Sequence, residues 1–574
     1  MTNLANPQLH WSNAYQEALE SLTAGANAWA NTSPKQRIAL LEQVKDAVLS
    51  VSAEWATTAA RRKQIPDDSP LVGEEWLSGP YAVMSACNGF ITTLSKIGGK
   101  AFLDRLPTRT LSTGQTAVQV VPGDAWDRLL LSGVSAEVWM EPGIGLRDLY
   151  SNAASAYDVP EGGRTGRVAL VLGAGNIASI APLDVFQKLL IENQVVLLKM
   201  NPVNDYLTEF LEIALAPLID CDALRIVKGD GEAGEWLTGH ELVDEIHITG
   251  AAATHDAIVW GTGAQGDANK ALGRPKNERP ITSELGAVCP TIVVPGPWVN
   301  ADVAFQAEHL ATQKLHNSGF NCIACQVLVL PEGWTKTQPL LDELASVMSG
   351  SRRGAYYPGA EQRLGTFAEA AGTRSVDRGD SPSVLINDVS ADPSLASVEV
   401  FAPALSTHYL DAPDPESYLR NAIAWANDSL HGTLGASIII HPETIKAIGE
   451  QRFEEIIAEL HYGAIGINAW TGVAFLLTAT PWGAFPGHTL EDVQSGIGTV
   501  HNTYMLENTE RTVVRAPFRP FPRSVAAAET SLLPKPPWFI THARQHEMGE
   551  LLTDFAHTAS WSKLPKLFAA ALRG

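Results

Sequence analysis

Cys322 has the sequence surroundings of a nucleophilic thiol. It ends the loop-like stretch Asn317-Ser-Gly-Phe-Asn-Cys322, and the strand-like run Gln326-Val-Leu-Val-Leu330 follows it. A strand so close to the thiol would hold it in one place, as a covalent step requires. Two carboxylates accompany it along the chain, Glu284 in Ser-Glu284-Leu-Gly286 and Glu399 in Glu399-Val-Phe-Ala-Pro403. The set predicts thioester chemistry, with Glu284 as the general base that activates water.

Each of these residues also has a simpler interpretation. A lone cysteine is ordinarily a buried, unreactive thiol, and a lone glutamate is ordinarily solvated or ion-paired. Cys322 and Cys325 form a C-x-x-C pair, but no second cysteine pair and no histidine pair stands at ligand spacing, so we expect no metal site. The five cysteines are scattered and odd in number, which favours reduced thiols and a cytoplasmic protein.

A nucleotide-binding pattern precedes the thiol. The run Gly173-Ala-Gly175-Asn176-Ile-Ala178 follows the strand-like Arg167-Val-Ala-Leu-Val-Leu172 and matches the G-x-G-x-x-A form of the dinucleotide fingerprint. The acidic residue expected at the end of the second strand is missing, and Lys199 stands there, which favours a ribose that carries a phosphate. A tight turn and a solvated lysine remain the alternative interpretation.

The remaining elements predict an α/β protein of several parts. Amphipathic helices are expected over about residues 12–60, and residues 116–142 resemble a β-hairpin arm. Strands alternating with helices from residue 166 predict a parallel sheet with the nucleotide at its carboxyl edge. A second α/β segment extends to about residue 468, and a Pro-rich stretch and a final helix follow.

Length and charge narrow the classes of protein. A chain of 574 residues exceeds the ~250–300 residues at which one core stops growing, so we expect two or three domains. The net charge of −22 disfavours a nucleic-acid partner, which needs a basic surface. No stretch approaches the ~18 apolar residues of a membrane span, so no membrane partner is expected. The first ten residues show no export signal.

Eight short segments in order resemble the landmarks of the aldehyde dehydrogenase superfamily, from about residue 20 to about residue 515. They are Gly-Asn176, Leu-Leu-Lys199, Ile-Thr-Gly250, Ser-Glu284-Leu-Gly286, Asn317-Ser-Gly-Phe-Asn-Cys322, Glu399-Val-Phe-Ala-Pro403, Ile-Asn468 and Pro481-Trp-Gly483. The resemblance implies a Rossmann-like parallel-sheet cofactor domain (1–115 and 143–283, with the helical lead-in), an oligomerisation arm (116–142), an α/β catalytic domain (284–500) and a C-terminal oligomerisation segment with a tail (501–574).

The resemblance also implies roles for single residues. Cys322 is the nucleophile, Glu284 the base, and the Asn176 amide stabilises the oxyanion together with the Cys322 backbone N–H. Gly175, Lys199, Gly250, Glu399 and Phe401 bind the cofactor, and Glu399 holds the nicotinamide ribose. This chain departs from the pattern at Phe320, at Ala287-Val288 and at Pro202, where many members hold a ribose-binding glutamate. Without that carboxylate, NADP becomes as credible a cofactor as NAD.

The function expected from these residues is the NAD- or NADP-dependent oxidation of an aldehyde to a carboxylic acid. One alternative is an acyl-CoA reductase-like enzyme in which CoA resolves the thioester, although the presence of Glu284 counts against it. A second is a catalytically weak nucleotide-binding homologue. A serine hydrolase is disfavoured because no G-x-S-x-G motif occurs. The arm and the stretch 515–523 have no evident partner in their own domains, so we expect a homodimer or homotetramer.

Overall fold

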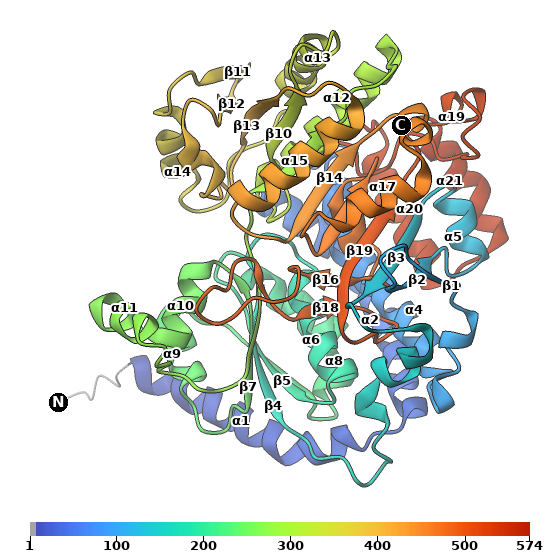
Figure 1. Ribbon diagram of the computed structural model, residues 1–574. Coiled ribbons are helices and arrows are strands. Elements are labelled where there is room, and N and C mark those ends of the chain that lie inside the picture. The colour runs from blue at the N-terminus through green and yellow to red at the C-terminus, as the bar shows by residue number, and fades with distance from the viewer. Residues whose placement is uncertain (1–6) are drawn as a thin grey trace.

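The computed structural model describes residues 7–574, and Figure 1 shows that two β-sheets with helices around them form its body. The predicted cofactor segment starts at residue 1, so its first six residues lie outside the described part. Of the first ten residues, in which no export signal was expected, six lie outside the described part too. Among residues 7–574 no helix is long and apolar enough to cross a membrane.

The first sheet, here called the β4 sheet, carries the predicted nucleotide motif. Its strand order within the described chain is β17-β8-β7-β4-β5-β6, parallel except for β17. The bounds are β4 (Val168–Leu172), β5 (Val195–Lys199), β6 (Leu224–Val227), β7 (Glu245–Gly250), β8 (Ile281–Leu285) and β17 (Gly496–Ile497). The strands predicted over 167–249 are confirmed. β4, β5 and β7 are almost wholly buried, as apolar runs in parallel sheets predict.

The second sheet, the β10 sheet, is named after the strand that follows the predicted nucleophile loop, residues 317–322. Its order in the described residues is β1-β2-β3-β19-β15-β14-β9-β10-β13-β12-β11. The bounds are β1 (Thr108–Thr110), β2 (Thr116–Val121), β3 (Ser135–Met140), β9 (Cys289–Val293), β10 (Cys325–Pro331), β11 (Arg374–Arg378), β12 (Ser381–Asp388), β13 (Ala404–Leu410), β14 (Gly435–Ile439), β15 (Ala464–Ile467) and β19 (Thr509–Arg515). A separate ribbon pairs β16 (Pro481–Gly483) with β18 (Thr499–His501).

The predicted arm has a partner within its own chain. β3 pairs antiparallel with β19, and β19 pairs parallel with β15, so the hairpin β2–β3 extends the β10 sheet. The strand that pairs with the arm lies outside the arm's own predicted domain, in the predicted C-terminal segment 501–574. Hydrogen bonds between residues that lie so far apart along the chain cannot be inferred from local pattern. The expected oligomer stays a prediction.

Helices cover both sheets. Those before the nucleophile loop are α1 (Pro7–Ala30), α2 (Pro34–Arg62), α3 (Val72–Trp76), α4 (Ala82–Leu94), α5 (Ala125–Leu130), α6 (Ile180–Phe186), α7 (Thr208–Ala214), α8 (Ala216–Ile219), α9 (Gly231–Thr238), α10 (Ala252–Trp260), α11 (Gly263–Ala271) and α12 (Asn300–Leu315). The predicted start of α2 is confirmed, because the Ser33 side chain accepts from the Gln36 backbone N–H and Pro34 begins the helix.

The later helices lie around the β10 sheet or form part of the C-terminal region, which is red in Figure 1. They are α13 (Thr337–Gly350), α14 (Ala360–Ala368), α15 (Pro415–Ser429), α16 (Pro442–Ile448), α17 (Glu450–Ala458), α18 (Thr471–Leu476), α19 (Arg523–Ala526), α20 (Gln545–His557) and α21 (Leu564–Ala571). The final helix predicted near 564–572 is confirmed. α20 and α21 lie beside α5, at the far end of the arm (Figure 1).

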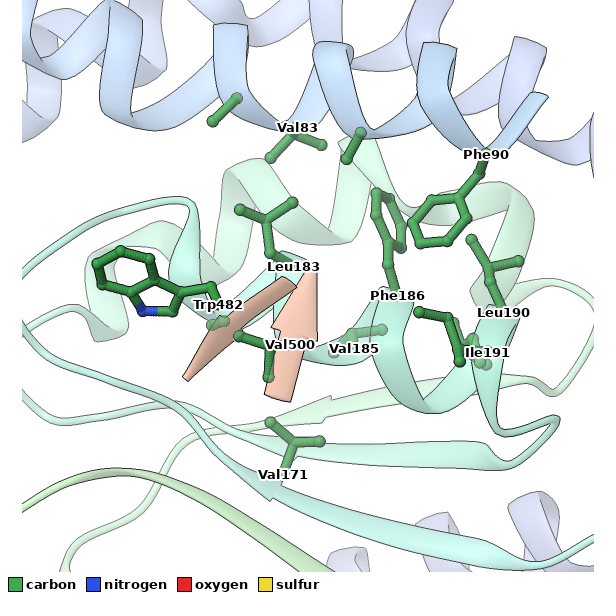
Figure 2. Packing of buried hydrophobic residues seen from close by; sticks show 14 of the residues in the cluster. Val83, Phe90, Val171, Leu183, Val185, Phe186, Leu190, Ile191, Trp482 and Val500 are labelled. Carbon is green, nitrogen blue, oxygen red and sulfur yellow. The ribbon is translucent and has the colours of Figure 1, made fainter. Parts of the chain in front are cut away.

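The largest apolar core lies around α6. Figure 2 shows Phe90 of α4 against Phe186 of α6, and the two rings meet edge to face with centroids 6.3 Å apart. Below them lies Val171 of β4, and Trp482 and Val500 of the β16–β18 ribbon lie at the side (Figure 2). All five side chains are buried. The ribbon is therefore held against the β4 sheet, which places Trp482 beside the end of β8.

Candidate active site

The thiol and the predicted base meet although they come from different sheets. Glu284 lies on β8 and Cys322 lies in the loop before β10, and Cys322 Sγ donates to Glu284 Oε1 over 3.7 Å. Glu284 Oε1 also accepts from Trp482 Nε1 at 2.7 Å. Trp482 was not predicted as a site residue, because its role depends on the packing of the β16–β18 ribbon.

Burial sets the protonation of this pair. It raises the pKa of Glu284 to about 8, with a further contribution from the Asp184 carboxylate. Burial likewise raises the pKa of the Cys322 thiol well above its usual range, and Glu284 and Glu399 add to that shift. At neutral pH the resting pair is therefore mostly a thiol and a carboxylic acid. Glu284 is the carboxylate in contact with the thiol and the natural acceptor of its proton.

The loop that carries Cys322 is held in an unusual backbone conformation. Asn317 and Ser318 both have positive φ, 51° and 57°, and Gly319 follows at 85°. A Cβ on Gly319 would lie 2.8 Å from the Ala402 carbonyl oxygen, so glycine is required there. Two non-glycine residues in this region need outside support, because the left-handed conformation costs energy.

A buried charged cluster supplies that support. The Asn317 backbone N–H donates to Glu74 Oε2 at 3.0 Å, and Glu74 pairs with Arg353. Beside them Lys63 Nζ lies 2.9 Å from Glu75, and these four side chains are at most 2% exposed. The cluster was not predicted, because Glu74 and Asn317 are far apart along the chain. It connects the N-terminal helices to the nucleophile loop.

Removing one member of this cluster should destabilise the fold. We expect Glu74→Ala to lower the free energy of unfolding by about 3–5 kcal/mol, because Arg353 would stay buried without its counter-charge. Denaturant unfolding of the whole chain measures the loss. The matched control is Asp67→Ala, which breaks the exposed ion pair with Arg61 and should change little. Equal effects of the two substitutions would contradict the supporting role of the cluster.

The Asn176 amide lies at the site but has a partner there. Asn176 Nδ2 donates to the Phe320 carbonyl at 3.0 Å, and Asn317 Nδ2 donates to the same oxygen. The amide thus contacts the backbone of Phe320, which lies two residues before Cys322 in the same loop. It keeps a second N–H, which the predicted oxyanion role requires.

A cleft of about 950 Å³ brings the predicted cofactor residues together. Its lining includes Gly175, Lys199, Gly250, Glu399 and Phe401, together with Asn176, Glu284 and Cys322. It also includes Asp230, Tyr357 and Arg363, which were not predicted. Burial lowers the pKa of Lys199, and Asp230 opposes that shift. An acidic side chain therefore accompanies the lysine in this cleft, on the β6–α9 loop rather than at the end of β5.

Two glycines make room for larger groups in the cleft. A Cβ on Gly175 would lie 2.8 Å from both the Tyr357 hydroxyl and Asn201 Oδ1, and one on Gly286 would lie 1.9 Å from Glu399 Oε2. The Glu399 carboxylate thus rests on the backbone that follows β8. Burial raises the pKa of Glu399 to about 8, although Lys314 and Arg363 oppose the shift. Arg363 also donates to the carbonyls of Val400 and Phe401, which fixes this loop.

A second, apolar cavity reaches the thiol from the other side. Its volume is about 60 Å³, and its lining includes Ile177, Trp470, Phe475 and Trp482. Cys322 and Asn176 line both this cavity and the cleft. The thiol therefore stands where the large cleft meets the small apolar cavity.

Comparison with known proteins finds similarity to one family. A sequence profile described as the aldehyde dehydrogenase family matches residues 180–378. The chain is 25% identical over 323 residues to aminoaldehyde dehydrogenase 2, peroxisomal, of Malus domestica, covering 52% of this chain and 55% of that one. It is 23% identical over 447 residues to an aldehyde dehydrogenase of Craterostigma plantagineum, covering 74% and 83%.

Over residues 180–378 the chain thus resembles the aldehyde dehydrogenase family. Its identity to the relatives is low, and the chain spans about half the length of the aminoaldehyde dehydrogenases that it matches. The fold is that of the superfamily. The crystal structure of an NAD-dependent aldehyde dehydrogenase from Sinorhizobium meliloti matches with a TM-score of 0.58 at 17% identity, covering 89% of this chain and 88% of that one. The Mycobacterium tuberculosis aldehyde dehydrogenase complexed with NAD+ matches with a TM-score of 0.56 at 17% identity, covering 86% and 88%.

The other cysteines of the chain are placed less well than Cys322 for the predicted nucleophile role. All five are free, and Cys325 is buried at the start of β10 with its thiol directed to the Val327 carbonyl. The Cys289 thiol donates to the Cys322 carbonyl at 3.3 Å. Among residues 7–574 no group of histidine, cysteine or acidic side chains could hold a metal ion.

Proposed function

We propose that this protein oxidises an aldehyde to a carboxylic acid, with NAD or NADP as the oxidant and a thioester on Cys322 as the intermediate. The observation that carries the proposal is the position of Cys322, which lines both the large cleft and the apolar cavity and contacts Glu284. An aldehyde in the apolar cavity and a dinucleotide in the cleft would thus meet at one sulfur. The resemblance to the aldehyde dehydrogenase family supports the same reaction.

The side chains at the site have the groups that this reaction needs. Glu284 accepts the proton of the Cys322 thiol, and the thiolate attacks the aldehyde carbonyl. The free N–H of Asn176 and the Cys322 backbone N–H stabilise the negative oxygen of the adduct. After oxidation, Glu284 releases that proton to solvent and then takes one from water, which attacks the thioester; the Cys322 sulfur leaves as a thiolate and takes this proton back from Glu284. The C–S bond breaks, the carboxylic acid leaves and the thiol is restored.

The residues of the cleft fit a dinucleotide. Glu399 Oε1 is buried without a hydrogen-bond partner among the described residues, so it is available for a ribose hydroxyl. The spaces at Gly175 and Gly286 would be filled by any side chain. When bound, the cofactor supplies the acceptor for the hydride that the adduct loses. The name of one structural neighbour mentions NAD+ and that of another mentions NAP, which supports either choice.

Lys199 should decide between the two dinucleotides. We expect NADP to bind at least as well as NAD, because a phosphate on the ribose gains a charge-assisted contact with Lys199. Lys199→Ala should then weaken NADP binding about tenfold or more and NAD binding less, as one charged hydrogen bond predicts. Titration of the whole protein with each nucleotide measures both. A strong preference for NAD that is unaffected by Lys199→Ala would contradict this role and would direct attention to Asp230.

The acyl-CoA reductase-like alternative differs in what resolves the thioester. Glu284 contacts the thiol and is held by Trp482, which supports water as the second nucleophile. Absorbance at 340 nm, followed with a panel of aldehydes and with either nucleotide, tests the proposed function. The rate should not depend on CoA, and the product should be the free acid. Formation of an acyl-CoA would favour the reductase, and nucleotide binding without turnover would favour the catalytically weak homologue.

The cytoplasmic location and the homodimer or homotetramer remain predictions. Light scattering of the whole chain at micromolar concentration would establish the assembly. The proposed chemistry requires neither, because the site residues named above all come from one chain.

A further inference from the structure

A larger apolar cavity adjoins the one at Cys322. Its volume is about 330 Å³, within the ~300–1,000 Å³ range of small-molecule sites. The two cavities share four lining side chains, Leu77, Val473, Leu476 and Trp538. These side chains form the boundary between the inner cavity, which contains the thiol, and the outer one. An elongated substrate that bound at Cys322 would extend toward this boundary.

The outer cavity has walls from distant parts of the chain. They come from α4, α5, the end of α18, the segment 532–538, α20 and α21, and Figure 1 shows α5, α20 and α21 side by side. None of the residues of α5 is buried, although Trp126, Leu129 and Leu130 are apolar. Trp126 meets Phe555 of α20 at a centroid distance of 5.3 Å. The apolar side chains of α5 therefore border a space rather than a filled core.

The charge of the lining restricts what can occupy this space. Among the described residues that line the two cavities there is no lysine or arginine, and His316 at the inner one is the only histidine. The acidic residues of the lining, Asp124 and Asp127, both lie at the start of α5. Asp124 accepts from the backbone of Trp126 and Asp127, and Asp127 Oδ2 accepts from the Gly123 N–H. A substrate tail with a carboxylate would find no counter-charge here and two like charges.

We propose that the outer cavity binds the aliphatic tail of a medium- or long-chain aldehyde whose carbonyl reacts at Cys322. This inference rests on the proposed function and names its substrate class. Each methylene moved from water into an apolar site improves binding about fourfold. The tail passes Leu476 and Trp538 and ends among the side chains of α5, α20 and α21.

The test compares aldehydes that differ only in their tails. With the whole chain and its preferred nucleotide, kcat/KM for straight-chain aldehydes should rise about fourfold per methylene, which amounts to about 1,000-fold for octanal over propanal. Butanal should be a better substrate than 4-aminobutanal or 4-oxobutanoate, which carry a charge at the far end. A flat dependence on chain length would overturn the proposal. So would a preference for 4-aminobutanal over octanal, which would make Asp127 an ammonium site.

A variant that fills the outer cavity separates this proposal from other causes of chain-length preference. Ala556 of α20 is half-buried and lines the outer cavity. Ala556→Phe should lower the octanal-to-propanal ratio of kcat/KM at least tenfold. The matched control adds the same ring on an exposed helical alanine, Ala24→Phe on α1, and should keep the ratio. An unchanged ratio in Ala556→Phe would place the tail elsewhere.

A binding measurement keeps the tail site distinct from the reaction. Octan-1-ol has no carbonyl group for the thiol to attack, so its binding can be measured without any reaction. Calorimetry should show that octan-1-ol binds to the parent chain and to Ala24→Phe, and at least tenfold more weakly to Ala556→Phe. If no aldehyde is oxidised but octan-1-ol binds in this pattern, the proposed reaction fails and the apolar site stands. If propanal is oxidised but octan-1-ol does not bind, the reaction stands and the apolar site fails.

Discussion

Cys322→Ala should abolish aldehyde oxidation while nucleotide binding persists. We expect a loss of ~10⁴-fold or more, because the covalent step has no substitute once the nucleophile is removed. The alanine leaves the cleft intact, since Gly175, Lys199 and Glu399 come from other segments. Steady-state rates measure the first outcome, and calorimetric titration with the nucleotide measures the second.

Cys325→Ala is the matched control for this experiment. Cys325 is a buried thiol three residues away, and its thiol is directed to the Val327 carbonyl rather than to the site. Its removal should leave most of the activity. Mass spectrometry after treatment with a haloacetaldehyde, which imitates the substrate, should find the label on Cys322. A label on Cys325 would show that the nucleophile has been misplaced.

Glu284→Gln should lower both the first turnover and the steady-state rate, each by at least ~10²-fold. The sequence predicts Glu284 as the base for water, which alone would preserve a rapid burst of reduced nucleotide. The structure adds an earlier role, because the thiol donates to Glu284 and its own pKa is raised by burial. A glutamine cannot accept that proton. If Glu284→Gln still gave a burst of reduced nucleotide with full amplitude and rate, Glu284 would act only in the hydrolysis of the thioester.

The same carboxylate predicts the pH dependence of the parent chain. Glu284 acts as a base only when ionised, and burial raises its pKa to about 8. The rate should therefore rise about tenfold per pH unit below pH 8 and level off above it. Because the thiol and the carboxylate share a hydrogen bond, the measured pKa belongs to the pair. A pH profile of kcat/KM that is flat from pH 6 to pH 9 would exclude Glu284 as the rate-determining base.

Asp184→Asn provides a sharper form of this test. Asp184 is fully buried, accepts from the Thr249 hydroxyl at 2.9 Å and helps to raise the pKa of Glu284. The asparagine keeps the size of the side chain and removes its charge. The midpoint of the pH profile should move to lower pH, because one charge that opposes ionisation of Glu284 is gone. A midpoint that stays in place would assign the profile to another group.

The fold supports several local conclusions drawn from the sequence. The strands β4, β5, β6 and β7 were predicted as runs of apolar residues, and the start of α2 followed from a capping residue and a proline. Such signals act over a few residues, so they can be read along the chain. The short landmarks around Glu284, Cys322 and Glu399 were sufficient to predict one cleft, and the structure brings these residues together there.

The sequence alone thus predicted the fold class, the loop that carries Cys322 and the chemical types of the side chains in the cleft. The tertiary structure alone decided how they are supported: Glu74 holds Asn317, Trp482 holds Glu284, and β19 pairs with β3. It also decided the pKa of Glu284, because that shift depends on the burial of the carboxyl group and on the nearby Asp184, which no local pattern shows. The outer cavity between α5, α20 and α21 likewise exists only in the tertiary structure. Contacts between segments hundreds of residues apart depend on the whole packing, and no local pattern carries them.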